Sequence, residues 1–274
     1  MSMERRLYSD DRYYDPNWQP PEIVYGDNLI ARATDTEENY AVITMEIPWE
    51  LVKDKVVKKP VQVLFVPNMH IETLQSIEQS ISNDIQMVMG IGGGSSHDCA
   101  KYVALKKNIR LVQIPTMFGG DAVVCSAIGI RQDGLVKYIA HTSADKVYVD
   151  FSLIRNAPEK LVRYGAADIL SSYTALLDWK LAAKRGKEKY NDEAAEYARN
   201  ELLGKLQTKA YHIKKLTDEG IKTIVELFIG YARLGNRFGT DRVQEGSEHF
   251  FCYNAEYMTK GRTFMEHCCR LVFG

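Results

Sequence analysis

Residues 85–102 read Ile-Gln-Met-Val-Met-Gly-Ile-Gly-Gly-Gly-Ser-Ser-His-Asp-Cys-Ala-Lys-Tyr and carry the strongest structural signal in the chain. The apolar run 85–89 predicts a strand, and residues 98–102 are typical of the start of a helix. Glycines between them can adopt positive φ, and a helix N-terminus offers free N–H groups and partial positive charge. This order predicts a phosphate site, although three consecutive glycines are also compatible with a simple tight turn.

The residues around this stretch show the alternation expected of a parallel sheet covered on both faces. Strands are predicted at 40–45, 61–66, 85–89, 111–114 and 146–149, and helices at 71–81 and 99–106. From about Pro158 the apolar residues recur three and four apart, as in 161–183 and 221–234, which predicts helices. We therefore predict an α/β dinucleotide-binding domain over 1–155 and a helical metal- and substrate-binding domain over 156–274.

The overall composition argues against a nucleic-acid or membrane partner. The 274 residues include 35 Lys plus Arg and 36 Asp plus Glu, so no net field attracts polyanions. No apolar stretch approaches the roughly 20 residues that a bilayer span needs, and the N-terminus carries charges where a signal peptide needs an apolar core. We expect a cytoplasmic protein that binds a small molecule. The odd number of cysteines, 5, favours free thiols over a disulfide framework.

Three strings in a fixed order carry a family resemblance. They are GIGGGSSHDCAKYVA (90–104), IPTMFGGDAVVCSA (114–127) and YGAADILSSYTALLDWKLA (164–182). Together they resemble the family that contains glycerol-1-phosphate dehydrogenase, glycerol dehydrogenase and the iron-containing alcohol dehydrogenases, with dehydroquinate synthase as a more distant relative. The resemblance runs from about Ile23 to the last residue. It implies metal and substrate in a cleft between an α/β nucleotide-binding domain and a helical domain.

The resemblance also implies a set of cofactor contacts for NAD or NADP. The residues concerned are Gly92, Gly93, Gly94, Ser95, Asp98, Thr116 and Ser126. Ser126 lies one residue later than the family pattern places its serine. Glu46 is a candidate for the acidic residue that would bind the ribose, and the sequence leaves both NAD and NADP open.

Asp121 lies where related enzymes carry an acidic residue near the nicotinamide and substrate. We therefore consider it the catalytic candidate, either orienting the alcohol or relaying its proton. The alternative is that Asp121 only caps a turn in a glycine-containing loop.

A possible metal site comes from three separated segments. Asp168 has mostly apolar neighbours, so its carboxylate needs a partner; His249 follows Gly-Ser-Glu at 246–248, and His267 lies on another predicted helix. One oxygen and two imidazoles suit zinc or ferrous iron. In the family the ligands are an Asp in a GxxD motif, a His in a GSEH-like motif and a later His, which Asp168, His249 and His267 match.

The function implied is a metal-dependent, NAD(P)-linked alcohol or polyol dehydrogenase, most similar to the sn-glycerol-1-phosphate dehydrogenases. Hydride would pass between nicotinamide and a metal-bound alcohol, or a ketone such as dihydroxyacetone phosphate. Two alternatives stay open. One is a truncated homologue without turnover, since family members continue for several helices after the His267 motif. The other is a carbocyclic synthase of the dehydroquinate type, whose metal-binding acid is usually Glu rather than Asp.

The same comparison with the family predicts a homo-oligomer. His267 lies close to the last residue, Gly274, and terminal turns fray unless something packs on them. We therefore expect a neighbouring subunit to cover the last helix of a chain that looks shortened at its C-terminus.

Overall fold

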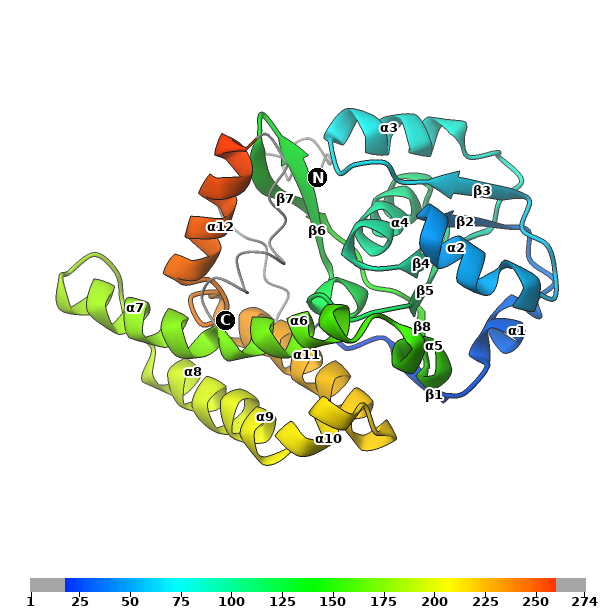
Figure 1. Cartoon of the computed structure of the whole chain (residues 1–274). Helices are drawn as coiled ribbons and strands as arrows, with labels where there is room; N and C mark the ends of the chain where they lie inside the picture. Colours follow the sequence, from blue (N-terminus) through cyan, green and yellow to red (C-terminus); the bar gives the residue numbers. More distant parts are fainter. Residues whose placement is uncertain (1–17, 260–274) are drawn as a thin grey trace.

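The computed structural model describes residues 18–259, and Figure 1 shows an α/β region at the right followed by a helical region at the left and bottom. Six parallel strands form the sheet in the order β1-β8-β5-β4-β2-β3. They are β1 (Glu22–Gly26), β2 (Tyr40–Thr44), β3 (Gln62–Phe65), β4 (Met87–Gly92), β5 (Arg110–Pro115) and β8 (Lys146–Asp150). The predicted fold class, a parallel α/β sheet followed by helices, is confirmed.

Helices cover both faces of the sheet because its central strands are apolar on both sides. In β2, Ala41 and Ile43 join one core cluster, and Tyr40 and Val42 join another. The first cluster takes in buried residues of α3 and α4, and the second takes in α1, α2 and α5. These helices are α1 (Leu29–Thr34), α2 (Glu46–Val52, continued by the 3₁₀ turn Lys53–Lys55), α3 (Ile71–Ser80), α4 (Gly94–Lys107) and α5 (Phe151–Asn156).

The connection between β4 and α4 is shorter than the sequence suggested. β4 continues to Gly92 and α4 begins at Gly94, so Gly93 alone links them, and the helix starts a full turn before Asp98. Gly92 has φ 144°, a value that side-chain-bearing residues rarely adopt. Gly90 has a different role, because a Cβ there would lie 2.3 Å from Gln113 Oε1 and 2.9 Å from Ala100 Cβ.

An antiparallel hairpin between β5 and β8 was missed by the sequence analysis. Its strands are β6 (Ala127–Gln132) and β7 (Leu135–His141), joined by Asp133 and Gly134, whose φ values are 56° and 76°. An Asp-Gly pair with positive φ at both positions is the preferred two-residue hairpin turn. Arg131 of the hairpin pairs with Glu256 of α12 at 2.5 Å between Nε and Oε1, which ties the hairpin to the helical region.

The helical region surrounds α11 (Asp218–Phe238), whose apolar face is buried along its length. The remaining helices are α6 (Glu159–Leu170), α7 (Ser172–Lys184), α8 (Asp192–Tyr197), the π-helix Ala198–Gly204, α9 (Lys205–Thr208), α10 (Ala210–Lys215) and α12 (Ser247–Met258). The predicted helical stretch 161–183 is divided at Ser171 into α6 and α7. The two helices still follow each other as a nearly continuous rod (Figure 1). None of the helices within 18–259 combines the length and apolar character that a bilayer crossing requires.

We expect Gly90→Ala to lower the free energy of unfolding by about 1–3 kcal/mol, because overpacking the α4–β4 contact forces backbone or side chains to shift. Urea denaturation measures the change. Gly94→Ala is the matched control, since a Cβ there would meet only Ala122 Cβ, at 3.7 Å. Equal destabilisation of both variants, or of neither, would contradict the proposed role of Gly90.

Candidate active site

Five of the seven predicted cofactor residues, Gly92, Gly93, Gly94, Ser95 and Thr116, lie at the carboxyl ends of β4 and β5. Gly92 and Pro115 are paired across these strands, and Thr116 donates its backbone N–H to the Gly92 carbonyl at 2.9 Å. The N-cap residue of α4 is Gly93, which has no side chain that could cap the helix. Backbone N–H groups at a helix N-terminus suit a pyrophosphate, so the geometry fits the predicted cofactor turn.

Glu46 lies at the edge of the same turn. It is the exposed first residue of α2, just beyond the end of β2, which pairs with β4. Pro48 in the same helix approaches the turn, since its Cγ lies 3.5 Å from the position of a Cβ on Gly92. An acidic residue at this strand end is where a dinucleotide's ribose is held in related α/β folds.

The loop after β5 lies between the cofactor turn and α6. It contains the 3₁₀ turn Asp121–Val123. A Cβ on Gly94 would lie 3.7 Å from Ala122 Cβ, and a Cβ on Gly120 would lie 3.7 Å from Asp168 Oδ2. Asp121, the catalytic candidate, therefore sits in a segment that borders the predicted cofactor contacts on one side and a predicted metal ligand on the other.

The environment of Asp121 changes its acidity. Burial raises the pKa of Asp121 to about 6, the negative charge of Asp168 adds to this rise, and Lys101 opposes it. A carboxyl group with a pKa near neutrality can both accept and release a proton under physiological conditions. This property suits the proton-relay role better than the alternative of a turn cap.

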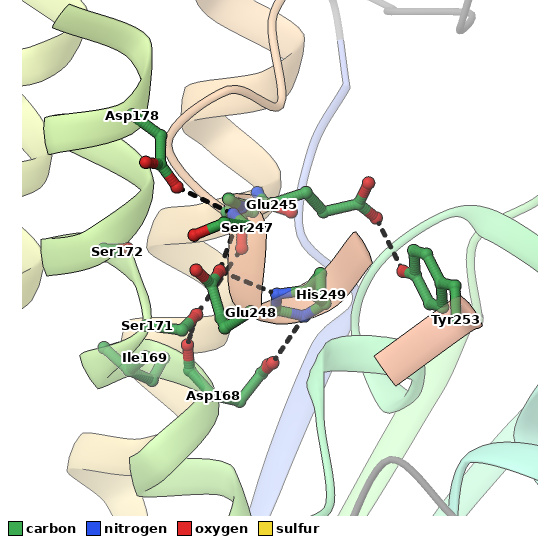
Figure 2. Close-up of polar contacts among 12 residues, drawn as sticks. Asp168, Ile169, Ser171, Ser172, Asp178, Glu245, Ser247, Glu248, His249 and Tyr253 are labelled. Atoms are coloured by element: carbon green, nitrogen blue, oxygen red, sulfur yellow. Dashed lines mark hydrogen bonds and ion pairs between the residues drawn. The ribbon is translucent and has the colours of Figure 1, made fainter. Parts of the chain in front are cut away.

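Asp168 and His249 meet across two helices, as Figure 2 shows. Asp168 Oδ1 of α6 lies 3.4 Å from His249 Nε2 in the first turn of α12. The other ring nitrogen, Nδ1, faces Glu248 Oε1 at 3.0 Å, and that oxygen also accepts the Gly246 N–H at 2.9 Å. Two of the three predicted metal ligands are thus brought together, with a carboxylate behind the imidazole.

These carboxylates make the position of the imidazole favourable for positive charge. Burial by itself lowers the pKa of His249, but hydrogen bonds to Asp168 and Glu248 outweigh it and raise the pKa to about 10. The negative charge of Glu245 acts in the same direction. A surplus of carboxylates around one buried imidazole is the electrostatic setting that a cation site needs.

Neighbouring helices hold the pair in place. Tyr231 of α11 donates its hydroxyl to the Asp168 carbonyl at 3.0 Å, and Ser171 Oγ donates to the same carbonyl at 2.6 Å. On the other side, the Ser247 N–H at the start of α12 donates to Asp178 Oδ2 of α7 at 2.7 Å (Figure 2). The separation of Asp168 and His249 is therefore set by backbone-anchored contacts.

The separation of the two donor atoms fits a shared metal ion. Ligand atoms about 2.1 Å from a tetrahedral zinc lie about 3.4 Å from each other, and Asp168 Oδ1 and His249 Nε2 are 3.4 Å apart. The Glu248 contact to Nδ1 matches the carboxylate that commonly orients a metal-bound histidine. Within residues 18–259, no group of three or more His, Cys, Asp and Glu side chains forms a complete metal site. The third predicted ligand, His267, lies outside the described residues.

Two polar contacts define the other predicted cofactor residues more closely. Asp98 forms an ion pair with Lys101, 2.7 Å between Oδ1 and Nζ, and Ser126 Oγ lies 3.2 Å from His141 Nδ1. The sequence analysis did not single out Lys101 or Glu248. The spacing of Asp98 and Lys101, three residues apart on a helix, was the available signal for their contact, whereas Glu248 was visible only as a letter of the GSEH-like string.

Comparisons with known proteins show a family relationship and a shared fold. Residues 27–158 match the family model described as iron-containing alcohol dehydrogenase. The chain is 32% identical over 173 residues to the glycerol-1-phosphate dehydrogenase [NAD(P)+] of Methanococcus aeolicus, covering 63% of this chain and 50% of that protein. It is 28% identical over 247 residues to the enzyme of the same name from Methanothrix thermoacetophila, covering 90% and 64%.

Solved structures show the same fold. A probable glycerol dehydrogenase from Sinorhizobium meliloti 1021 superposes with a TM-score of 0.70 at 16% identity, covering 92% of this chain and 74% of that one. Glycerol dehydrogenase from Schizosaccharomyces pombe gives 0.67 at 18% identity, covering 95% and 70%. The comparisons relate this chain to the iron-containing alcohol dehydrogenase family through residues 27–158, and its curated relatives are named glycerol-1-phosphate dehydrogenase [NAD(P)+]. The matched parts span 50% and 53% of the length of two of these relatives, and up to 73% of another.

We expect Gly93→Val to weaken nicotinamide nucleotide binding by about tenfold or more, because a branched side chain would obstruct the approach of pyrophosphate to the backbone. Fluorescence titration with NADH and NADPH measures the affinity. The protein itself has room, since a Cβ at Gly93 meets only the Met117 side chain, at 3.4 Å or beyond. Unfolding temperature and metal content should therefore stay as in the wild type. Unchanged affinity would show that Gly93 serves only the turn.

We expect Asp168→Asn, His249→Ala and His267→Ala each to lose stoichiometric metal, and Glu248→Gln to weaken metal affinity by about 10–100-fold. Elemental analysis of purified protein and titration of the metal-stripped protein with zinc measure these effects. Asp178→Asn is the control. Asp178 accepts a hydrogen bond from the Ser247 N–H at the start of the same helix, but it does not contact the imidazole of His249. Full occupancy in all three ligand variants would refute the site.

Proposed function

We propose that this chain is a metal-dependent, NAD(P)-linked alcohol or polyol dehydrogenase, most similar to glycerol-1-phosphate dehydrogenase. The observation that carries the proposal is the Asp168–His249 pair at 3.4 Å, with the Asp121 loop between it and the cofactor turn. This layout would place a cation, an acid that can exchange a proton, and a nicotinamide around one small volume. A polyol phosphate or the corresponding ketone, such as dihydroxyacetone phosphate, is the proposed substrate.

The bound groups supply the chemistry that side chains lack, since nicotinamide exchanges hydride and a divalent cation acts as a Lewis acid toward the substrate oxygen. In the proposal, Asp168 and His249 hold the cation together with His267. Glu248 Oε1 would accept a hydrogen bond from the Nδ1–H of His249, which fixes the tautomer that leaves Nε2 available as a ligand. Zinc or ferrous iron suits this donor set equally well.

Asp121 would handle the proton of the substrate hydroxyl. Its pKa of about 6 leaves most of the carboxyl groups ionised at neutral pH while keeping protonation accessible. The position of its loop against Gly94 on one side and Asp168 on the other would bring the carboxylate close to the reacting carbon. Orientation of substrate against nicotinamide by such a loop lowers the entropic part of the barrier.

The first turn of α4 would bind the cofactor's pyrophosphate, and Glu46 would face the ribose. A carboxylate there accepts hydrogen bonds from the ribose hydroxyls of NAD and repels the 2′-phosphate of NADP. The names of the related glycerol-1-phosphate dehydrogenases cover both nucleotides. A sulfoacetaldehyde reductase of the same fold from Bifidobacterium kashiwanohense was solved with NAD+. We therefore propose NAD as the preferred cofactor.

A second candidate function, nucleotide binding without turnover, is an outcome of the test below.

Self-association remains part of the main proposal. Leu170, Tyr173, Leu177 and Leu181 lie exposed along one side of α6 and α7. A second copy of the chain would remove this apolar strip from water.

The proposal predicts that the purified protein contains one divalent metal and oxidises NADH with dihydroxyacetone phosphate faster than with unphosphorylated ketones. A spectrophotometric screen of polyols and glycerol phosphates with both cofactors tests this, alongside the mass of the active species. His249→Ala should abolish turnover while nucleotide still binds, because His249 lies in the metal pair and not in the cofactor turn. Metal-loaded protein that binds nucleotide but turns over no substrate would favour the second candidate.

A further inference from the structure

Lys101 of α4 carries a buried ammonium group about two turns after the start of the helix. Its side chain is only 1% exposed, and lysine is rarely buried to this degree unless its charge is paired. Burial of an ion pair costs several kcal/mol of desolvation per ion, so such a pair contributes little net stability compared with apolar packing. Stability alone therefore does not account for a lysine at this position.

The ammonium group joins three segments of the chain. Its Nζ lies 2.7 Å from Asp98 Oδ1 on the same helix and donates to the Cys125 carbonyl at 3.3 Å and to the Ala127 carbonyl. Cys125 ends the loop that contains Asp121, and Ala127 begins the hairpin strand β6. The ammonium thus forms one ion pair and hydrogen bonds to two backbone carbonyls, with Cys125 Sγ at 3.7 Å.

The same charge acts on both acidic candidates of the site. Burial raises the pKa of Asp98, and Lys101 is the largest opposing influence. Burial also raises the pKa of Asp121, which Lys101 again opposes. Burial lowers the pKa of Lys101 itself, but Asp98, Cys125 and Asp121 outweigh it, so the ammonium stays charged.

Other groups near Asp98 oppose the rise in its pKa less than Lys101 does. The charged and titratable groups that interact with it are Lys101 and Cys99 on α4, Cys125 and Asp121 in the loop, and Arg131 on β6. Arg131 is already paired with Glu256 at 2.5 Å. Without Lys101, the Asp98 carboxylate would keep only the hydrogen bond from the Gly129 backbone and the charge of Arg131.

We propose that Lys101 is a positioning residue that holds the ionised Asp98 carboxylate and the end of the Asp121 loop in one arrangement for the nicotinamide nucleotide. This inference rests on the proposed function, since it assumes that Asp98 lies beside the cofactor. Lys101 touches neither cofactor nor substrate in this account. It acts through Asp98 and through the Cys125 and Ala127 carbonyls.

The test compares nucleotide affinity and its pH dependence in Lys101→Met, Lys101→Arg and the double variant Lys101→Met/Asp98→Asn. NADH and NADPH are the probes, and their binding to the full chain is measured by fluorescence titration. Lys107→Met is the matched control, because Lys107 lies on the same helix and pairs with Glu78 at 3.2 Å, away from the turn. Unfolding temperature is recorded for every variant.

We expect Lys101→Met to weaken the wild-type affinity by about tenfold, the effect of disturbing one charge-assisted contact. Loss of the ammonium raises the pKa of Asp98, so the ionised fraction grows with pH. The remaining affinity should therefore rise with increasing pH more steeply than the affinity of the wild type. Lys101→Arg should restore part of the affinity. The double variant should regain thermal stability, since no unpaired carboxylate is left buried, but not affinity.

Three results would overturn the inference. One is a nucleotide affinity of Lys101→Met equal to that of the wild type. Another is a loss of affinity that parallels the loss of unfolding temperature across all variants and does not depend on pH. The third is recovery of affinity in the double variant, which would show that the Asp98 carboxylate is dispensable. If the wild type bound neither nucleotide, the proposed function would fail and the inference with it. Wild-type binding with an unaffected Lys101→Met would remove the inference alone.

Discussion

Helix α4 lies directly on β4 because Gly90 has no side chain, and the rest of the site depends on this close approach. A Cβ at Gly90 would collide with Gln113 and Ala100, so any larger residue would push the helix outward. With α4 in place, its N-terminus meets the carboxyl end of the sheet at Gly93, where a pyrophosphate can reach backbone N–H groups. The same placement buries Lys101 of α4.

The loop after β5 carries this geometry over to the helices. The Gly165 N–H of α6 donates to the Phe118 carbonyl at 3.0 Å, and a Cβ at Gly165 would lie 2.9 Å from that oxygen. Helix α6 is therefore held against the loop by its backbone, and Asp168 is held one turn further along. His249 reaches it from α12, whose start is fixed on α7 through Asp178. Short backbone contacts thus link the cofactor turn, the Asp121 loop and the Asp168–His249 pair.

The sequence predicted the features that depend on local pattern. Apolar runs marked five of the six parallel strands closely, and family motifs named Asp168 and His249, which the structure brings together. The hairpin was missed because its main cue, Asp133-Gly134, is short and its strands are only partly apolar. Because the hairpin was not predicted, the contact of Lys101 with the Ala127 carbonyl at its start could not be predicted either. The orientation of His249 depends on side-chain rotamers of Glu248, which no spacing rule specifies.

The central claim is that Asp168 and His249 share one metal ion in a dehydrogenase site. An anomalous difference map, from crystals of the purified protein recorded at the absorption edge of its metal, tests it most directly. The account predicts a single strong peak within about 2.0–2.2 Å of both Asp168 Oδ1 and His249 Nε2. A metal peak elsewhere in the molecule, with the His249 ring hydrogen-bonded directly to Asp168 and no density between them, would contradict it.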